Sequence, residues 1–86
     1  MKRKKGGERT ITGIVVPENW DDNDNVIRVG IMTPDYQKYV IEHNKNGKEL
    51  LAFIDHKVKA TGTLRERLDG DIIISVKSYE LTETLY

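Results

Sequence analysis

The side chains of this 86-residue chain that could hold a cation are concentrated in the segment ENWDDNDN, Glu18–Asn25. Oxygen-bearing side chains at alternating positions are typical of calcium-binding loops. Counted from Asp21, however, the position that needs glycine is occupied by Val26, and the twelfth position is Met32 instead of glutamate. The pattern therefore favours a structural turn rich in Asp and Asn, and we predict neither a metal nor a cofactor.

The histidines and serines form no pattern that is typical of catalysis. His43 and His56 lie in or beside predicted loops with no evident catalytic partner. Ser75 and Ser78 lie on a predicted strand, outside the strand–turn–helix context that exposes a nucleophilic serine. The carboxylates show no recognisable acid/base spacing, and there is no glycine-rich phosphate-binding loop. We therefore predict a protein without enzymatic activity.

The positive charge is concentrated at the start of the chain, in Lys2, Arg3, Lys4 and Lys5. Without these four residues, 10 basic residues face 14 acidic ones, so the rest of the chain carries a net charge of 10 − 14 = −4. Because like charges repel and Gly-Gly disfavours a packed element, residues 1–8 are predicted to be a flexible arm. The arm could add salt-dependent contacts to nucleic acid or to an acidic partner, or it could serve solubility alone. The acidic remainder argues against a general nucleic-acid binder.

Length and composition limit the architecture. Eighty-six residues, of which 37% are hydrophobic and 33% charged, suit one small globular domain. The chain has no cysteine, so disulfides and thiolate metal sites are excluded. No apolar run approaches the roughly 18 residues of a membrane span, and polar residues follow the basic start where a signal peptide needs apolar ones. We therefore expect a cytoplasmic protein that does not bind membranes.

Five segments have the composition of β-strands, and one has that of a helix. The predicted strands are RTITGIVV (Arg9–Val16), VIRVGIMT (Val26–Thr33), YQKYVIE (Tyr36–Glu42), KVKATGTLRE (57–66) and IIISVKSYEL (Ile72–Leu81). Pro17 is expected to end the first strand, and the Asp-Gly pair of LDGD predicts a hairpin turn between the last two. KELLAFI (Lys48–Ile54) has apolar residues spaced for one face of a short helix.

Alternation of apolar and polar residues predicts which side chains face the core. If Val40 in the third strand faced the core, Lys38 would be buried beside it, and burying an unpaired lysine is very costly. Tyr39 and Ile41 are therefore expected to point inward. The residues expected to point outward are Tyr36, Lys38 and Val40. In the other strands the residues expected inward are Ile27, Val29, Ile31, Val58, Ala60, Gly62, Leu64, Ile72, Ile74 and Val76.

A closed barrel is the arrangement that best suits these elements, because an open five-stranded sheet would leave two edges and one face uncovered. The order of three strands, a short helix and two strands resembles the OB-fold, a five-stranded Greek-key barrel. Gly13, the helix KELLAFI and the pair VKATGTLRE and DIIISVKSYEL carry the resemblance, which extends from about Arg9 to Leu81 and is similar to small stand-alone bacterial OB-fold proteins. The predicted fold class is all-β, a five-stranded Greek-key OB-fold barrel with one short helix between strands three and four. The domain covers residues 9–81, between the arm (1–8) and a C-terminal end (82–86).

The resemblance implies a ligand surface on the outer face of strands two and three, flanked by the loop between strands one and two and by the loop between strands four and five. Arg28 and Lys38 would contact phosphates, Tyr36 would stack on a base, and Gly30 would allow close approach of a backbone. Further basic residues on the last hairpin would extend this surface, namely Lys59, Arg65, Arg67 and Lys77. Trp20 could stack on a base, anchor a partner, or fold back over the mouth of the barrel.

Two functions stay open at this point. The first is a binding module for single-stranded nucleic acid, with weak sequence selectivity and strong salt dependence. The second is a protein-docking module, because the carboxylates of the loop around Asp21 would repel phosphates and Trp20 suits a protein partner. The chain would be a monomer, or a weak homodimer formed through an edge strand.

Overall fold

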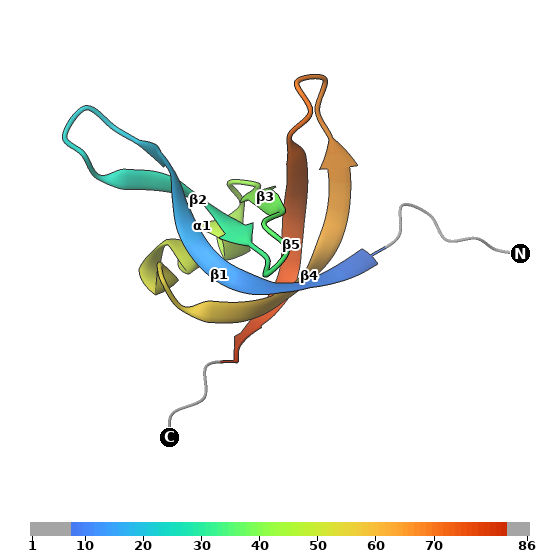
Figure 1. Ribbon diagram of the computed structural model, residues 1–86. Coiled ribbons are helices and arrows are strands. Elements are labelled where there is room, and N and C mark those ends of the chain that lie inside the picture. The colour runs from blue at the N-terminus through green and yellow to red at the C-terminus, as the bar shows by residue number, and fades with distance from the viewer. Residues whose placement is uncertain (1–7, 83–86) are drawn as a thin grey trace, which may run out of the picture.

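The structure is a computed structural model, and it describes residues 8–82 (Figure 1). The elements are β1 (Glu8–Trp20), β2 (Val26–Met32), β3 (Lys38–Ile41), α1 (Lys45–Leu50), the 3-10 helix η1 (Leu51–Phe53), β4 (Lys57–Glu66) and β5 (Ile72–Leu81). The strands close into a barrel in the order β1-β2-β3-β5-β4. The predicted fold class is therefore confirmed as a closed five-stranded barrel, with six residues of α1 and three of η1 forming the helical segment between β3 and β4.

The strand β1 pairs with two different neighbours along its length. Its first half is antiparallel to β4, from the pair Glu8–Thr63 to the pair Ile14–Lys57. From Ile14 onward it is antiparallel to β2. At the point of change a Cβ on Gly13 would lie 2.3 Å from the carbonyl oxygen of Met32, so only glycine allows the two strands to approach this closely.

The prediction that Pro17 ends the first strand is wrong. Pro17 lies within β1, opposite Val29 of β2, and the strand continues to Trp20. A register shift between Pro17 and Asn19 marks a bulge there. Bulges tolerate proline because the ladder is already interrupted at that point, so the missing N–H removes little.

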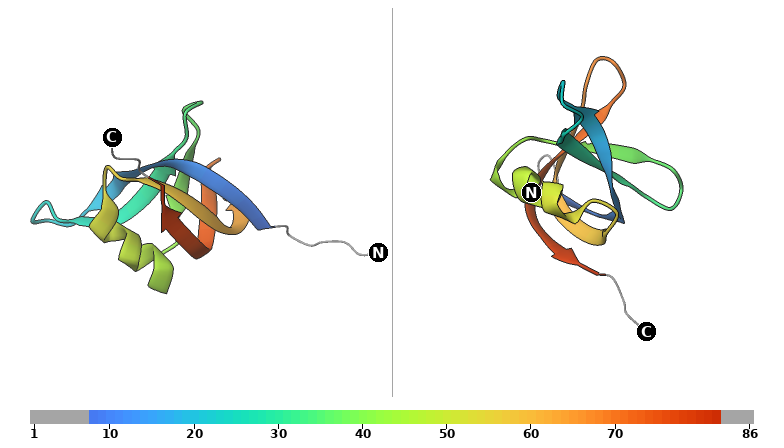
Figure 2. Two further views of the ribbon diagram at one scale, coloured as in Figure 1. Left: turned by 90° about the horizontal axis from the view of Figure 1, so that it is seen from below. Right: turned by 90° about the vertical axis from the view of Figure 1, so that its left-hand side faces the viewer.

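The core consists of aliphatic side chains from every strand together with Leu50 of α1. Its buried members are Ile11, Val15, Val29, Ile31, Ile41, Leu50, Val58, Ala60, Ile74 and Val76. Asn46 of α1 donates hydrogen bonds to the carbonyl oxygens of Val76 and Lys77 in β5, which fixes the helix against the barrel (Figure 2). None of the described helices is long and apolar enough to cross a membrane.

The helix begins three residues earlier than the predicted segment. Asn44 is its N-cap, with a side-chain oxygen that accepts a hydrogen bond of 2.8 Å from the N–H of Gly47. A Cβ on Gly47 would lie 2.1 Å from the carbonyl oxygen of Glu42, so this glycine allows the first turn to pack against the end of β3. The N-cap at Asn44 therefore starts the helix within a segment that the sequence predicts to be a loop.

Two predictions about which side chains face the core need correction. Ile27 is 42% exposed, because the register shifts on either side of Asn19 interrupt the alternation; Val26 packs against the core instead. Val40 lies outside the core cluster but is only 4% exposed. It pairs with Ile73 across the parallel β3–β5 contact. Tyr39 and Ile41 pack in or against the core, as predicted, and Lys38 is exposed.

Candidate functional site

Three arginines from separate parts of the chain line one groove on the outer surface of the barrel. Arg28 lies in β2, Arg65 in β4, and Arg67 directly after β4. The groove has a volume of about 290 Å³, and its other lining residues are Val40, Ile41, Glu42, His43 and Ile73. It crosses the neighbouring strands β2, β3, β5 and β4. The β1–β2 turn and the β4–β5 hairpin project from the same side of the barrel (Figure 1).

The arginine groove has an excess of positive charge. A guanidinium nitrogen of Arg65 lies 2.7 Å from Oε1 of Glu42, and Arg67 lies 3.9 Å from a carboxylate oxygen of Asp69. Within residues 8–82, Arg28 forms no ion pair. Glu42 is the only acidic residue of the lining, and with Asp69 it makes two carboxylates against three arginines, so the net excess is one positive charge. A planar guanidinium matches the geometry of a phosphate group, which makes this groove suited to phosphorylated ligands.

The floor of the arginine groove is apolar. Val40 and Ile73 are cross-strand partners and are 4% and 3% exposed. A Cβ on Gly30, the partner of Val40 on the other side, would lie 2.9 Å from the carbonyl oxygen of Tyr39, which allows β2 and β3 to pack closely here. Because both floor side chains are almost fully buried, they shape the groove, and the exposed groups that a ligand would meet are mainly those of the arginines.

The turn that flanks the groove on the β1–β2 side is built around Asp21. Its Oδ1 accepts hydrogen bonds from the main-chain N–H groups of Asn23 and Asn25, and its Oδ2 accepts one from the Asn25 amide. These hydrogen bonds, first of all that from the Asn25 backbone, lower the pKa of the Asp21 carboxyl. Within residues 8–82 no three His, Asp or Glu side chains lie close enough together to hold a metal ion. The carboxylate therefore serves to shape the turn.

Two of the predicted central contacts do not belong to the arginine groove. The ammonium of Lys38 lies 2.6 Å from Oε1 of Glu18 in β1, so its charge is neutralised within the protein. Tyr36 precedes β3 instead of lying on it, in a turn where its φ angle is 66°. Its side chain lines a different groove, beside Ile14 and Met32.

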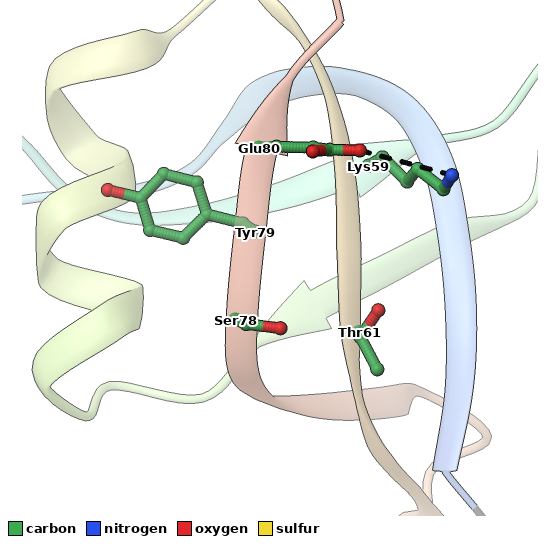
Figure 3. Close-up of a pocket in the computed structure, with 5 residues that line it drawn as sticks. All are labelled: Lys59, Thr61, Ser78, Tyr79 and Glu80. Carbon is green, nitrogen blue, oxygen red and sulfur yellow. Dashed lines mark ion pairs between the residues drawn. The ribbon is translucent and has the colours of Figure 1, made fainter.

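Lys59 and Lys77 lie on a third surface, formed by β1, β4 and β5. Lys59 is 3.9 Å from Glu80, and Lys77 is 2.5 Å from Glu8. Figure 3 shows the pocket of about 390 Å³ beside them, where the hydroxyl groups of Thr61 and Ser78 lie on adjacent strands. Acidic partners thus compensate both lysines, and this surface is polar without a net charge.

Tyr79 borders the same pocket but points toward α1 (Figure 3). Its hydroxyl donates a 2.8 Å hydrogen bond to Oε1 of Glu49. This hydrogen bond is the first cause that raises the pKa of the Tyr79 phenol, followed by burial and by the charge of Glu49. Tyr79 thereby ties the end of β5 to the helix.

Trp20 lies at the end of β1, next to the acidic turn, and is 51% exposed. It is not part of the core cluster, so its indole is available to a ligand or partner. The predicted arm residues Lys2, Arg3, Lys4 and Lys5 lie outside the described part of the chain.

The prediction missed Glu42 and His43 as lining residues of the arginine groove. Glu42 follows Lys38 and Val40 at intervals of two, so the alternation of the third strand already indicated its outward direction. His43 belonged to a predicted polar loop, and no pattern in the sequence pointed to the groove.

Comparisons of this chain with protein-family models, with curated proteins and with solved structures found no match. The strand order and the position of the helix are consistent with an OB-like fold.

Proposed function

We propose that this protein is a non-catalytic binding module of the OB-fold class, and that it binds single-stranded nucleic acid along the arginine groove. The convergence of Arg28, Arg65 and Arg67 in one groove carries this proposal. Cations that are distributed over four neighbouring strands suit an extended polyanion, and the exposed Trp20 offers a flat side chain for its bases.

The roles of the groove residues follow from their surroundings. Arg28 has no ion pair within residues 8–82 and contacts a phosphate without first losing a protein partner. Arg65 exchanges Glu42 for a phosphate. Because the arginines contact phosphates, which are the same in every sequence, binding is weakly sequence-selective.

The acidic turn directs the ligand. Its carboxylates repel phosphates at the tip of the β1–β2 ribbon, so the strand passes toward the β4–β5 hairpin, where Arg67 lies. Trp20, at the base of this turn, is exposed enough to stack on a base at the edge of the groove.

The test measures the fluorescence anisotropy of a labelled oligonucleotide of about 15 thymidines, titrated with the full chain at several salt concentrations. Arg28→Ala is expected to weaken binding and to reduce the slope of log Kd against log salt by about 0.7, the value for one lost phosphate contact on a single strand. Lys59→Ala, which removes a cation from the β1–β4–β5 surface, is the matched control and leaves the slope unchanged.

The arm requires a variant of its own, in which Lys2, Arg3, Lys4 and Lys5 are changed to serine. If this variant loses all binding while Arg28→Ala keeps wild-type affinity, the ligand is held by the arm and the groove proposal is wrong. Absence of binding by the wild-type chain even at about 50 mM salt would refute nucleic acid as the ligand.

A protein-docking module is the second candidate, and the exposed apolar residues of the β1–β2 ribbon favour it. Trp20 and Ile27 are 51% and 42% exposed, beside a turn that carries several carboxylates. An aromatic anchor with an acidic rim suits a basic protein surface. An oligonucleotide titration separates the two functions, because quenching of Trp20 fluorescence by the oligonucleotide supports the nucleic-acid module, whereas an unchanged signal supports protein docking.

A further inference from the structure

A second groove lies at the other end of β2 from Arg28. Ile14 of β1 and Met32 of β2 are cross-strand partners, and both line this groove of about 350 Å³. The remaining lining residues are Gly13, Thr33, Pro34, Tyr36 and Lys57. Ile14 is 38% exposed, so the groove presents apolar surface to solvent.

Tyr36 stands at the edge of this apolar groove in an unusual conformation. It is 86% exposed and has a φ angle of 66°, a left-handed conformation that bulky side chains rarely adopt. The turn is held by hydrogen bonds from the N–H of Tyr36 to the carbonyl oxygen of Thr33 and from the N–H of Gln37 to Thr33 Oγ1. Thr33 Oγ1 in turn donates to Asp35. The turn therefore presents an exposed aromatic side chain at the rim of the groove, where it is accessible to a partner.

A protruding aromatic residue and an apolar groove on one face make the face self-complementary. In a twofold-symmetric dimer the same patch meets itself, so each protrusion must find a groove on that same patch. The charges agree with this arrangement: Asp35 lies next to Tyr36, whereas Lys57 borders the groove, and both are exposed. Within residues 8–82 Lys57 forms no ion pair.

We propose that this protein forms a twofold-symmetric homodimer in which Tyr36 of each protomer packs into the groove between Ile14 and Met32 of the other. Asp35 of each protomer then faces Lys57 of the other. The proposal does not depend on nucleic-acid binding. Nucleic acid fits this groove less well, because Lys57 is the only basic residue of its lining.

Sedimentation velocity of the full chain from about 5 to about 500 µM tests the dimer. The wild-type chain is expected to shift from monomer to dimer, and Tyr36→Ala to raise the dimer dissociation constant at least about tenfold. Leu68→Ala is the matched control, because it truncates a fully exposed apolar side chain at the β4–β5 hairpin and leaves the dimer unchanged. A wild-type chain that stays monomeric throughout, or a Tyr36→Ala variant with the wild-type constant, overturns the proposal.

A charge exchange tests the arrangement of the two protomers. Lys57→Glu alone and Asp35→Lys alone each place like charges opposite one another twice, so each variant is expected to be monomeric. An equal mixture of the two variants restores both opposite-charge pairs and forms a heterodimer. Thermal melting of each variant establishes that it is folded. If the mixture associates no more strongly than either variant alone, the proposed arrangement is wrong. Arg28→Ala is expected to leave dimerisation unchanged, so the dimer and the nucleic-acid proposal can fail separately.

Discussion

Glu42→Gln should increase the affinity for single-stranded nucleic acid. In the free protein the Glu42 carboxylate lies 2.7 Å from Arg65 and is the only acidic side chain that lines the arginine groove. A bound phosphate must displace this carboxylate before it can contact Arg65. Glutamine keeps the size of the side chain but removes the charge, so Arg65 is available from the start.

The exposure of the Arg65–Glu42 ion pair sets the size of the effect. The ion pair is partly exposed, with 64% and 36% of the side-chain surfaces accessible, so breaking it costs at most about 1 kcal/mol, or about fivefold in affinity. Salt screens this exposed ion pair, so the gain in affinity should decrease as the salt concentration rises.

The assay is the anisotropy titration with the thymidine oligonucleotide, run in parallel on Glu42→Gln and Glu80→Gln. Glu80 is the partner of Lys59 on the β1–β4–β5 surface, so its replacement makes the same change in net charge away from the groove. We expect Glu42→Gln to bind more tightly with a steeper salt slope, and Glu80→Gln to match the wild type. Equal gains in both variants would show that net charge alone matters, and a loss of affinity in Glu42→Gln would refute the displacement of Glu42 by phosphate.

Two further predictions concern stability. Gly62→Ala should lower the free energy of unfolding by about 3 kcal/mol, because a Cβ there would lie 2.1 Å from the carbonyl oxygen of Ser75 at the β4–β5 bulge. A melting temperature within a few degrees of the wild type would contradict this prediction. Because the pKa of Tyr79 is raised, its contribution to the free energy of unfolding is present in full below the ordinary tyrosine pKa of 10.0. This contribution is lost as the pH rises through the raised value. In urea unfolding, Tyr79→Phe should therefore be less stable than the wild type by about 1 kcal/mol at pH about 8, and this difference should shrink above pH about 10. A difference that stays constant with pH would mean that the hydrogen bond to Glu49 is not responsible.

The strands whose signals are local could be predicted from the sequence. β4 and β5 have the predicted bounds, because the Asp-Gly turn and the alternation around Val58 and Ile74 are both properties of neighbouring residues. The errors occur where a strand that is distant in the sequence determines the local structure. Pro17 stays in β1 because β2 pairs with it through a bulge, and Val40 is buried because Ile73, from the far hairpin, lies beside it.

The site was less predictable than the fold for the same reason. Arg28, Arg65 and Arg67 were named as candidates, but only the strand order β2-β3-β5-β4 brings them to one groove. The prediction grouped Lys38 with them, although Glu18 of β1 compensates its charge. Which basic residues have acidic partners depends on the register between strands, and residue type alone does not contain this information.

The double pairing of β1 has a consequence for how the chain folds. The hairpins β1–β2 and β4–β5 join neighbours in the chain and can form early, whereas the barrel closes through distant contacts. Thr10 must meet Thr61, 51 positions away, and β3 meets β5 over only the three pairs from Tyr39–Ile72 to Ile41–Ile74. The chain loses conformational entropy as these long loops are ordered, before the new contacts contribute any stability. Closure of the barrel therefore limits the folding rate. Until it occurs, the edges of both hairpins are open to strands of other chains, and the newly made protein is most prone to aggregate in that interval.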